Sequence, residues 1–182
     1  MLSAIDLMAE KGYKGVSTKE IAAAAGVSEM TLFRNFGSKQ NLLEQAVDQY
    51  HYSVEMTEVF AGKLIWDLRA DLLMISEMYH DIMNRNRKLF LIVLSDNELS
   101  VIREKAQSHP KTLLALLTGY FNEMQKRNKM IPTDAELQAI TFMWMHYGAF
   151  MSHLFTKSDL TVKPMQDFMN SSVELFVKAL SP

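Results

Sequence analysis

Hydroxyl, basic and amide side chains recur every few residues between Ser17 and Lys39. Ser17 is followed three residues later by Glu20, a pairing in which the serine hydroxyl and the glutamate carboxylate cap the first turn of a helix. Arg34 has the most specific chemistry of the segment, because a guanidinium group can bind the edge of a guanine base or a phosphate group through paired hydrogen bonds. What Arg34 can reach depends on the elements that present it.

Two short helices joined by a tight turn account for this segment. The first spans 18–25 and is stopped by Gly26, since glycine readily adopts the left-handed conformation that ends helices. Ser28 then caps a second helix over 29–35. The apolar positions that we assign to the core between the helices are Ile21, Val27, Leu32 and Phe36. The arrangement is a helix-turn-helix, whose second helix usually lies in the major groove of DNA.

Length and composition limit the alternatives. The chain has 182 residues, of which 48% are hydrophobic, and their spacing of mostly three and four predicts an all-helical protein. It has no cysteine, which excludes disulfides and thiolate metal sites and favours a reducing compartment. No apolar run approaches the roughly 20 residues of a membrane-spanning helix. We therefore expect a cytoplasmic protein that has no membrane partner.

Positive charge is local, because the net charge of the whole chain is −2. The basic residues between positions 14 and 39 outnumber the two acidic ones, Glu20 and Glu29, and are Lys14, Lys19, Arg34 and Lys39. Phosphate contacts supply most of the non-specific affinity for DNA, so we expect that affinity to be moderate and to need two copies of the site. As single residues, Lys14 and Glu29 are explained equally well as solvated charges.

Glycines punctuate the first fifth of the chain, and longer helices follow. The helices that we predict are 2–11, 18–25, 29–35, 39–60, 64–84, 87–94, 97–107, 110–128, 134–155 and 164–180. Thr133 with Glu136 forms another capping box, and Pro164 opens the last helix. We divide the chain into a helix-turn-helix domain over 1–45 and a larger helical domain over 46–182, connected by the helix that begins at Ser38.

The N-terminal segment resembles the DNA-binding region of the TetR family of bacterial transcriptional regulators. The residues that carry the resemblance run from about Ile5 to Leu43 and are Gly12-Tyr13, Ile21-Ala22, Gly26-Val27-Ser28, Thr31-Leu32-Phe33, Phe36 and Ser38-Lys39. The resemblance implies a homodimer that binds double-stranded DNA through this segment. The long helices of the remaining chain look like the ligand-binding and dimerisation domain of that family.

The resemblance also implies roles for individual residues. Thr18 and Lys19 would contact phosphates, and Lys39 would add a further phosphate contact beside the start of its helix. The groove-facing residues would be Ser28, Glu29, Met30 and Thr31, with Arg34 further along. Phe33 and Asn35 occupy positions where the family often has tyrosine and histidine. The hydroxyls of Thr18, Ser28 and Thr31 would, however, also cap helices in a protein that binds no DNA.

Three features depart from the family pattern. Phe33 has no hydroxyl to donate, so it could only pack against the sugar–phosphate edge. Met30 is bulky where a small residue is common, and it could contact a thymine methyl group. The chain also begins inside its first helix, without the basic lead-in that is frequent in the family, so some DNA contacts could be absent.

The helix predicted over 134–155 is apolar around most of its circumference, and the last helix carries a broad apolar stripe. A helix that is apolar all round must be covered on every side, and a partner subunit is the natural cover in so short a chain. The interface residues that we predict are Leu137, Ile140, Trp144, Met151, Phe168, Ser172, Leu175, Phe176 and Ala179. Two-fold symmetry then requires a palindromic operator. The alternative is a monomer with an unusually apolar C-terminal hairpin.

The chain holds 14 methionines, several of them in helices expected to enclose a cavity. Methionine is flexible and polarizable, which suits a site that adapts to apolar or aromatic ligands. The lining residues that we predict are Met78, Tyr79, Ile82, Phe90, Leu117, Tyr120, Phe121, Met145 and Tyr147. Each of them is also explained as ordinary core. We expect Trp66, Asp67, Arg69 and Asp71 to form an exposed helix edge.

His146 and His153 are seven residues apart, too far for one metal ion without other ligands, and His80 lies on a different helix. We therefore expect no metal site and no cofactor. The sequence has no glycine-rich phosphate loop, nucleophile elbow or His-Glu metal box, which argues against an enzyme. We interpret the chain as a ligand-responsive transcriptional regulator, a repressor that a small apolar or aromatic effector releases from DNA. A helical adaptor that acts through protein contacts is the alternative.

Overall fold

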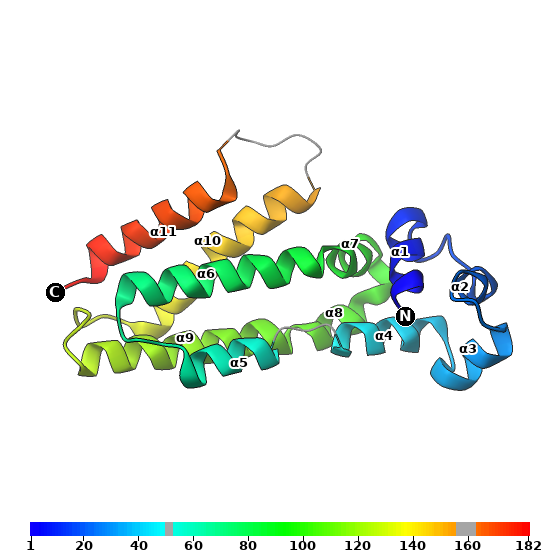
Figure 1. Ribbon diagram of the computed structural model, residues 1–182, viewed down its shortest axis with the longest axis horizontal. Coiled ribbons are helices and arrows are strands. Elements are labelled where there is room, and N and C mark those ends of the chain that lie inside the picture. The colour runs from blue at the N-terminus through cyan, green and yellow to red at the C-terminus, as the bar shows by residue number, and fades with distance from the viewer. Residues whose placement is uncertain (50–52, 156–162) are drawn as a thin grey trace. The chain divides into compact units, whose positions relative to one another are not determined.

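The computed structural model describes residues 1–49, 53–155 and 163–182, and every regular element within these ranges is a helix (Figure 1). This confirms the all-α prediction. Up to residue 106 the helices are α1 (Leu2–Lys11), α2 (Thr18–Ala24), α3 (Glu29–Phe36), α4 (Lys39–Gln49), α5 (Ser53–Gly62), α6 (Leu68–Arg85), α7 (Arg87–Ser95), the 3-10 turn η1 (Asn97–Leu99) and α8 (Ser100–Ala106). They are followed by α9 (Ser108–Lys126), α10 (Ala135–Phe155) and α11 (Met165–Leu180).

The chain folds into two compact units. The first unit comprises residues 1–51 and 85–108, and the second comprises 52–84 and 109–182. Residues 85–108 thus belong with the N-terminal helices, whereas the sequence division at residue 45 assigned them to the C-terminal domain. The helices α7 and α8 are part of the same unit as the helix-turn-helix.

Local capping explains why α2 and α3 begin where they do. The Ser17 hydroxyl accepts a hydrogen bond from the Glu20 amide at 3.2 Å, and the Glu20 carboxylate accepts one from the Ser17 amide at 2.9 Å. These hydrogen bonds, together with Lys11, lower the pKa of Glu20 to about 2. Gly26 ends α2 with a positive φ of 69°, and the Ser28 hydroxyl accepts from the Thr31 amide at 3.1 Å. Both predicted caps are confirmed.

The core of the first unit joins α1–α4 to α7 and α8. Ile21, Leu32 and Leu43 are buried in it together with Ile92 of α7 and Ile102 of α8. Exposed ion pairs connect the same parts of the unit. Lys88–Asp6 joins α7 to α1, Lys105–Asp48 joins α8 to α4, and Lys14–Glu98 joins the segment after α1 to η1. Such pairs add little stability individually, so the apolar core holds α7 and α8 against the N-terminal helices.

One core assignment from the sequence is wrong. Val27 is 42% exposed, because the turn between α2 and α3 directs it away from the packed faces of both helices. Ile21 and Leu32 are buried as expected, and Phe36 packs partly buried against the same core.

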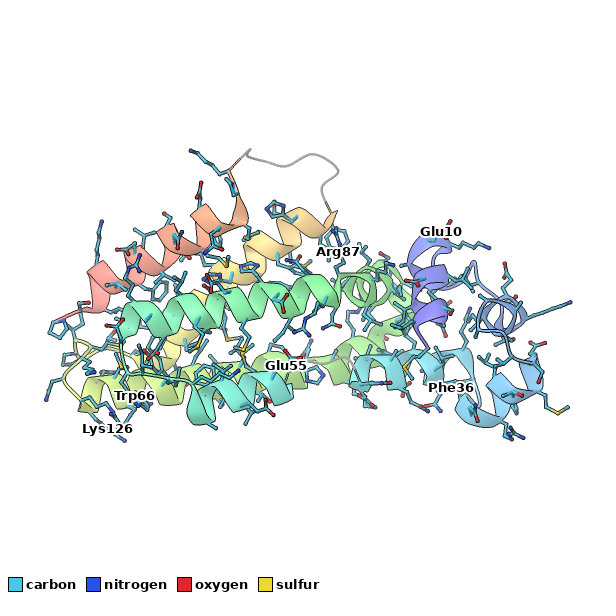
Figure 2. The ribbon with its side chains drawn as sticks, viewed as in Figure 1. Glu10, Phe36, Glu55, Trp66, Arg87 and Lys126 are labelled. Atoms are coloured by element: carbon cyan, nitrogen blue, oxygen red, sulfur yellow. The ribbon has the colours of Figure 1, made fainter. Side chains whose placement is uncertain are left out.

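The second unit encloses a buried carboxylate. Asp71 of α6 has no exposed surface, and its two oxygens accept hydrogen bonds from the Ile65 amide at 2.9 Å and the Tyr120 hydroxyl at 3.0 Å. The prediction that Asp71 lies on an exposed helix edge is therefore wrong. Burial and the neighbouring Asp71 charge raise the pKa of Tyr120. Trp66 stacks on Tyr120 with ring centroids 5.8 Å apart, beside the end of α9 where Lys126 lies (Figure 2).

Candidate nucleic-acid interface and ligand pocket

The helix α3 exposes two large apolar side chains to solvent. Met30 is 82% exposed and Phe33 is 69% exposed, while Leu32 on the opposite side is buried against the core. Arg34 and Asn35 are also exposed and follow Phe33 in the last turn. A helix of eight residues therefore combines a buried anchor with an outer surface that carries apolar, amide and guanidinium groups. Such a surface has contacts to offer both to thymine methyl groups and to base edges or phosphates.

One hydroxyl group joins α2 to the start of α3, and two others pair at the start of α3 itself. The Thr18 hydroxyl donates a hydrogen bond to the Glu29 carboxylate, and the Ser28 and Thr31 hydroxyls lie 2.9 Å apart. Phosphate oxygens only accept hydrogen bonds, so Thr18 must give up its bond to Glu29 in order to bind phosphate. Lys19, beside it on α2, is exposed.

Lys39 has a structural partner set that the sequence did not reveal. Its ammonium group donates to the backbone oxygens of Tyr13 at 2.7 Å and Val16 at 2.8 Å and lies 4.3 Å from the centre of the Tyr13 ring. Burial lowers the pKa of Lys39, partly opposed by the charge of Asp96. The phosphate contact implied by the family resemblance would have to compete with these interactions. The structure instead shows Lys39 tying the start of α4 to the segment between α1 and α2.

The predicted dimer residues divide into three groups. Leu137, Trp144 and Leu175 are 57%, 67% and 61% exposed. The other predicted residues outside the core are Ala179, which is exposed, and Ile140, Met151 and Phe168, which are partly buried. Ser172 and Phe176 are only 2% and 7% exposed, so they do not belong to an exposed face.

The two buried residues pack within the subunit. The Phe176 ring meets the Phe142 ring of α10 edge-on with centroids 5.1 Å apart, and the Ser172 hydroxyl lies 3.3 Å from Nε2 of His146. The broad stripe on α11 therefore has one side against α10 and another side exposed. A periodicity of 3.6 identifies the stripe but does not say how much of it a second helix of the same chain covers.

The residues predicted to line a ligand pocket differ in exposure. Tyr79, Ile82, Leu117, Tyr120 and Phe121 are buried, Met78 and Met145 are partly buried, and Tyr147 is 40% exposed. Phe90 lies in the first compact unit, apart from the others in the second.

A pocket of about 600 Å³ lies between α10 and α11 in the second unit. Its lining residues are Met145, Ala149, Ser152, His153, Lys163, Met165, Asp167, Phe168 and Ser171. Only Met145 was predicted as a lining residue, although Phe168 was predicted for the dimer interface. The sequence signal that was missed is the set of small residues Ala149, Ser152 and Ser171, which leave space between the two helices.

Two histidines that the sequence considered only for a metal form a buried pair. Nε2 of His80 on α6 lies 3.1 Å from Nδ1 of His146 on α10, and the side chains are 3% and 1% exposed. Burial, with a smaller contribution from the charge of His153, lowers the pKa of His80 to about 4. Burial and the charge of His80 lower that of His146 to about 3. Within the described residues no group of three or more His, Cys, Asp or Glu side chains is arranged to hold a metal ion.

Among the described residues, none of the helices combines the length and the apolar character that crossing a bilayer requires.

Comparison with known proteins finds a family match for the N-terminal helices. Residues 2–46 match the family described as bacterial regulatory proteins, tetR family. The chain is 29% identical over 185 residues to the HTH-type transcriptional regulator YvkB of Bacillus subtilis (strain 168), covering 98% of this chain and 94% of the relative.

Solved structures share the fold over nearly the whole chain. NalD of Pseudomonas aeruginosa, the secondary repressor of the MexAB-OprM multidrug efflux pump, superposes with a TM-score of 0.77 at 20% identity, covering 99% of this chain and 94% of NalD. AibR in complex with isovaleryl coenzyme A and operator DNA gives a TM-score of 0.65 at 20% identity, covering 96% of this chain and 95% of AibR.

Proposed function

Because the chain belongs to the TetR family of bacterial transcriptional regulators, we propose that it is a homodimeric repressor whose palindromic operator is released by a small apolar or aromatic effector. NalD is a repressor, and AibR was solved with both a ligand and operator DNA. Binding and regulation, without catalysis, are the activity that we assign to this chain.

The exposed surface of α3 is the observation that carries the proposal. Leaving Met30 and Phe33 in water costs free energy that a helix with only a structural task could avoid with polar residues at these positions. In the major groove, Met30 would contact a thymine methyl group, Phe33 would pack on the sugar–phosphate edge and Arg34 would bind guanine or phosphate. The remaining contacts that we propose are those of Thr18, Lys19, Ser28, Glu29, Thr31 and Asn35.

We propose that Lys39 does not contact DNA, although the family resemblance implies a phosphate contact for it. Two backbone carbonyls and an aromatic face already surround its ammonium group. Breaking these interactions to reach a phosphate would cost about as much as the new contact returns. We propose that Lys39 positions the helix-turn-helix and leaves the phosphate contacts to Lys19 and Arg34.

The homodimer would form through the exposed faces of α10 and α11. Leu137, Trp144 and Leu175 are more than half exposed, and Phe155 extends the α10 face with 52% exposure. Large apolar residues that cluster on one face of a soluble protein mark an interaction surface. An interface of this kind is isologous. It therefore repeats the recognition helix α3 across a two-fold axis and specifies a palindromic operator.

Effector control would pass between the units through the chain itself. The helix α6 ends at Arg85, where the first unit resumes, and α7 packs against α1 in the core of that unit. A ligand that prefers one arrangement of α6 would therefore bias the position of α1–α4 through α7, rather than through α4 alone. The shift in operator affinity equals the difference in ligand affinity between the two forms.

The decisive experiment isolates operator DNA without assuming its sequence. The purified full chain is incubated with sheared genomic DNA, and the bound fragments are sequenced and aligned. We expect the bound fragments to share a palindrome with half-sites about one helical turn of DNA apart. The logarithm of the binding constant should fall linearly with the logarithm of the salt concentration. A duplex of equal length with scrambled half-sites is the matched control. Fragments without a shared motif, or equal binding of both duplexes, would overturn the proposal and favour an adaptor.

A further inference from the structure

Three polar side chains form a buried network at the meeting of α6, α10 and α11. His80, His146 and Ser172 are each at most 3% exposed. Nε2 of His80 lies 3.1 Å from Nδ1 of His146, and Nε2 of His146 lies 3.3 Å from the Ser172 hydroxyl oxygen. Phe142 of α10 covers the His146 ring with centroids 4.3 Å apart. We call these three residues the imidazole network.

The hydrogen bonds of Ser172 determine where every proton in the network lies. The Ser172 hydroxyl donates to the backbone oxygen of Met169 at 2.9 Å, so it can only accept from His146. His146 must therefore carry its proton on Nε2 and accept on Nδ1. The bond to Nδ1 of His146 then requires a donating Nε2–H on His80, and a neutral imidazole has only one N–H.

The network consequently ends in an acceptor. Nδ1 of His80 holds a lone pair and no proton, and it has no hydrogen-bond partner among the described residues although it is buried. The lowered pKa values of both histidines keep the pair neutral near pH 7, so the lone pair stays available. A buried polar atom without a partner is costly and rare, and it marks a place where a donor from outside the chain is favoured.

A pocket adjoins the network across a single aromatic ring. Phe168 lines the pocket between α10 and α11, and its ring meets the imidazoles of His80 and His146 at steep angles with centroids 6.2 Å and 5.3 Å away. Met145 and Ala149, which also line the pocket, flank His146 along α10. A rotation of the Phe168 side chain would therefore join the pocket to the imidazole network.

We propose that this pocket takes an apolar ligand bearing one hydroxyl or N–H group, which passes Phe168 and donates its hydrogen bond to Nδ1 of His80. Taking this ligand to be the effector rests on the function proposed above, whereas its binding does not. The pocket's volume of about 600 Å³ is within the range of small-molecule sites, and Met145, Met165 and Phe168 provide apolar contact. A carboxylate can only accept hydrogen bonds, so it cannot pair with this lone pair.

The test uses three probes that differ in one group. The full chain is titrated calorimetrically with 4-butylphenol, with its methyl ether 4-butylanisole and with 4-butylbenzoate. We expect the phenol to bind about tenfold more tightly than the ether, the value of one buried hydrogen bond, and the benzoate to leave the Nδ1 acceptor of His80 unpaired. Equal affinities for phenol and ether would overturn the proposal. This measurement contains no DNA, so it can succeed where the regulatory function fails, and the reverse.

A pair of matched variants assigns the acceptor. His80→Phe should abolish the preference for phenol over ether, while His153→Phe, which alters another histidine at the pocket, should retain it. If His153→Phe alone abolishes the preference, His80 is not the acceptor.

Nitrogen-detected NMR of the histidine rings tests the wild-type chain without any substitution. We expect His80 to carry its proton on Nε2, and its Nδ1 resonance to move with the phenol but not with the ether. A proton on Nδ1 of His80, or an Nδ1 resonance that the phenol leaves unmoved, would contradict the assignment even if His80→Phe fails to fold.

Discussion

At the scale of single residues, the helix-turn-helix uses its positive charges for two different tasks. Arg34 extends from the exposed surface of α3, while the Lys39 ammonium is held by two backbone oxygens and the Tyr13 ring. The sequence places both residues in one motif and cannot separate them, because the carbonyls that hold Lys39 come from residues 23 and 26 positions earlier.

Substitution of Arg34 tests the groove-facing surface. We expect Arg34→Ala to weaken operator binding by about 1–3 kcal/mol, because a guanidinium contact to guanine or phosphate is lost. The measurement is a mobility-shift titration at fixed salt, and Lys178→Ala is the control, since it removes one positive charge from exposed α11. An Arg34→Ala protein with unchanged affinity would remove Arg34 from the interface.

The two lysines of the segment should respond in opposite ways. Lys39→Met should lower the free energy of unfolding by roughly 1–2 kcal/mol, since the Tyr13 and Val16 carbonyls lose a charged donor. Lys19→Met should leave stability within about 0.5 kcal/mol and reduce the salt dependence of operator binding by about one phosphate contact. Chemical denaturation and binding at several salt concentrations separate the two effects. A reduced salt dependence in Lys39→Met would return Lys39 to the phosphate contacts.

At the scale of elements, sequence patterns located the helices better than they located the faces. The predicted helix over 97–107 is the turn η1 followed by α8, and α10 is capped by Asp134, whose carboxylate accepts from the Leu137 amide at 2.9 Å, rather than by Thr133. The helix predicted over 39–60 corresponds to α4 and α5, and residues 50–52 lie outside the described ranges. Capping residues compete with their neighbours over one position, and only the backbone geometry decides between them.

The helices α6, α10 and α11 should lose stability together in mild acid. His80 and His146 have pKa values of about 4 and 3 in the folded protein, below the ordinary value of about 6.5. Their contribution is therefore complete above pH 6.5 and is lost as the pH falls towards 4, because the unfolded chain takes up protons that the folded chain does not. We expect the free energy of unfolding to fall by roughly 2–4 kcal/mol from pH 7 to pH 5.

Denaturation at the two pH values measures this loss, and an NMR titration of the histidine rings assigns it. His153→Gln is the control, because His153 is exposed and makes only the smaller contribution to the lowered pKa of His80, so the substitution should leave most of the loss intact. If His80 and His146 both titrate near pH 6.5 in the folded protein, the stability of these helices does not depend on their neutrality.

At the scale of the whole molecule, the sequence predicts the fold and the recognition helix α3. It does not predict which apolar residues contact one another. The motif from Gly12 to Lys39 is local, so its capping and packing can be derived from neighbouring residues. The grouping of residues 85–108 with the helix-turn-helix depends on contacts over about eighty positions, such as the Lys88–Asp6 ion pair. Core, pocket and interface are built from the same residue types. Composition alone therefore did not assign Tyr120 to the core, Met145 to the pocket and Trp144 to an exposed face.

Assembly should depend on the exposed face of α10. Trp144 is 67% exposed in the single chain, and an aromatic residue near the centre of an isologous interface is buried twice, once from each subunit. Trp144→Glu should place two like charges in that apolar contact and produce a monomer at micromolar concentration. A monomer has one recognition helix and makes half of the contacts to the operator. Operator affinity should therefore fall by at least a hundredfold, or about 2.7 kcal/mol.

The chain contains a matched control for this substitution. Ile65 is also 67% exposed and lies before α6 in the chain, outside both α10 and α11, so Ile65→Glu adds the same charge at the same exposure. Sedimentation velocity should report a dimer for the wild type and Ile65→Glu and a monomer for Trp144→Glu, with equal helical content in all three proteins. A dimeric Trp144→Glu would move the interface off this face. A monomeric wild type that still binds a palindrome would show that DNA, rather than the apolar face, brings the two copies together.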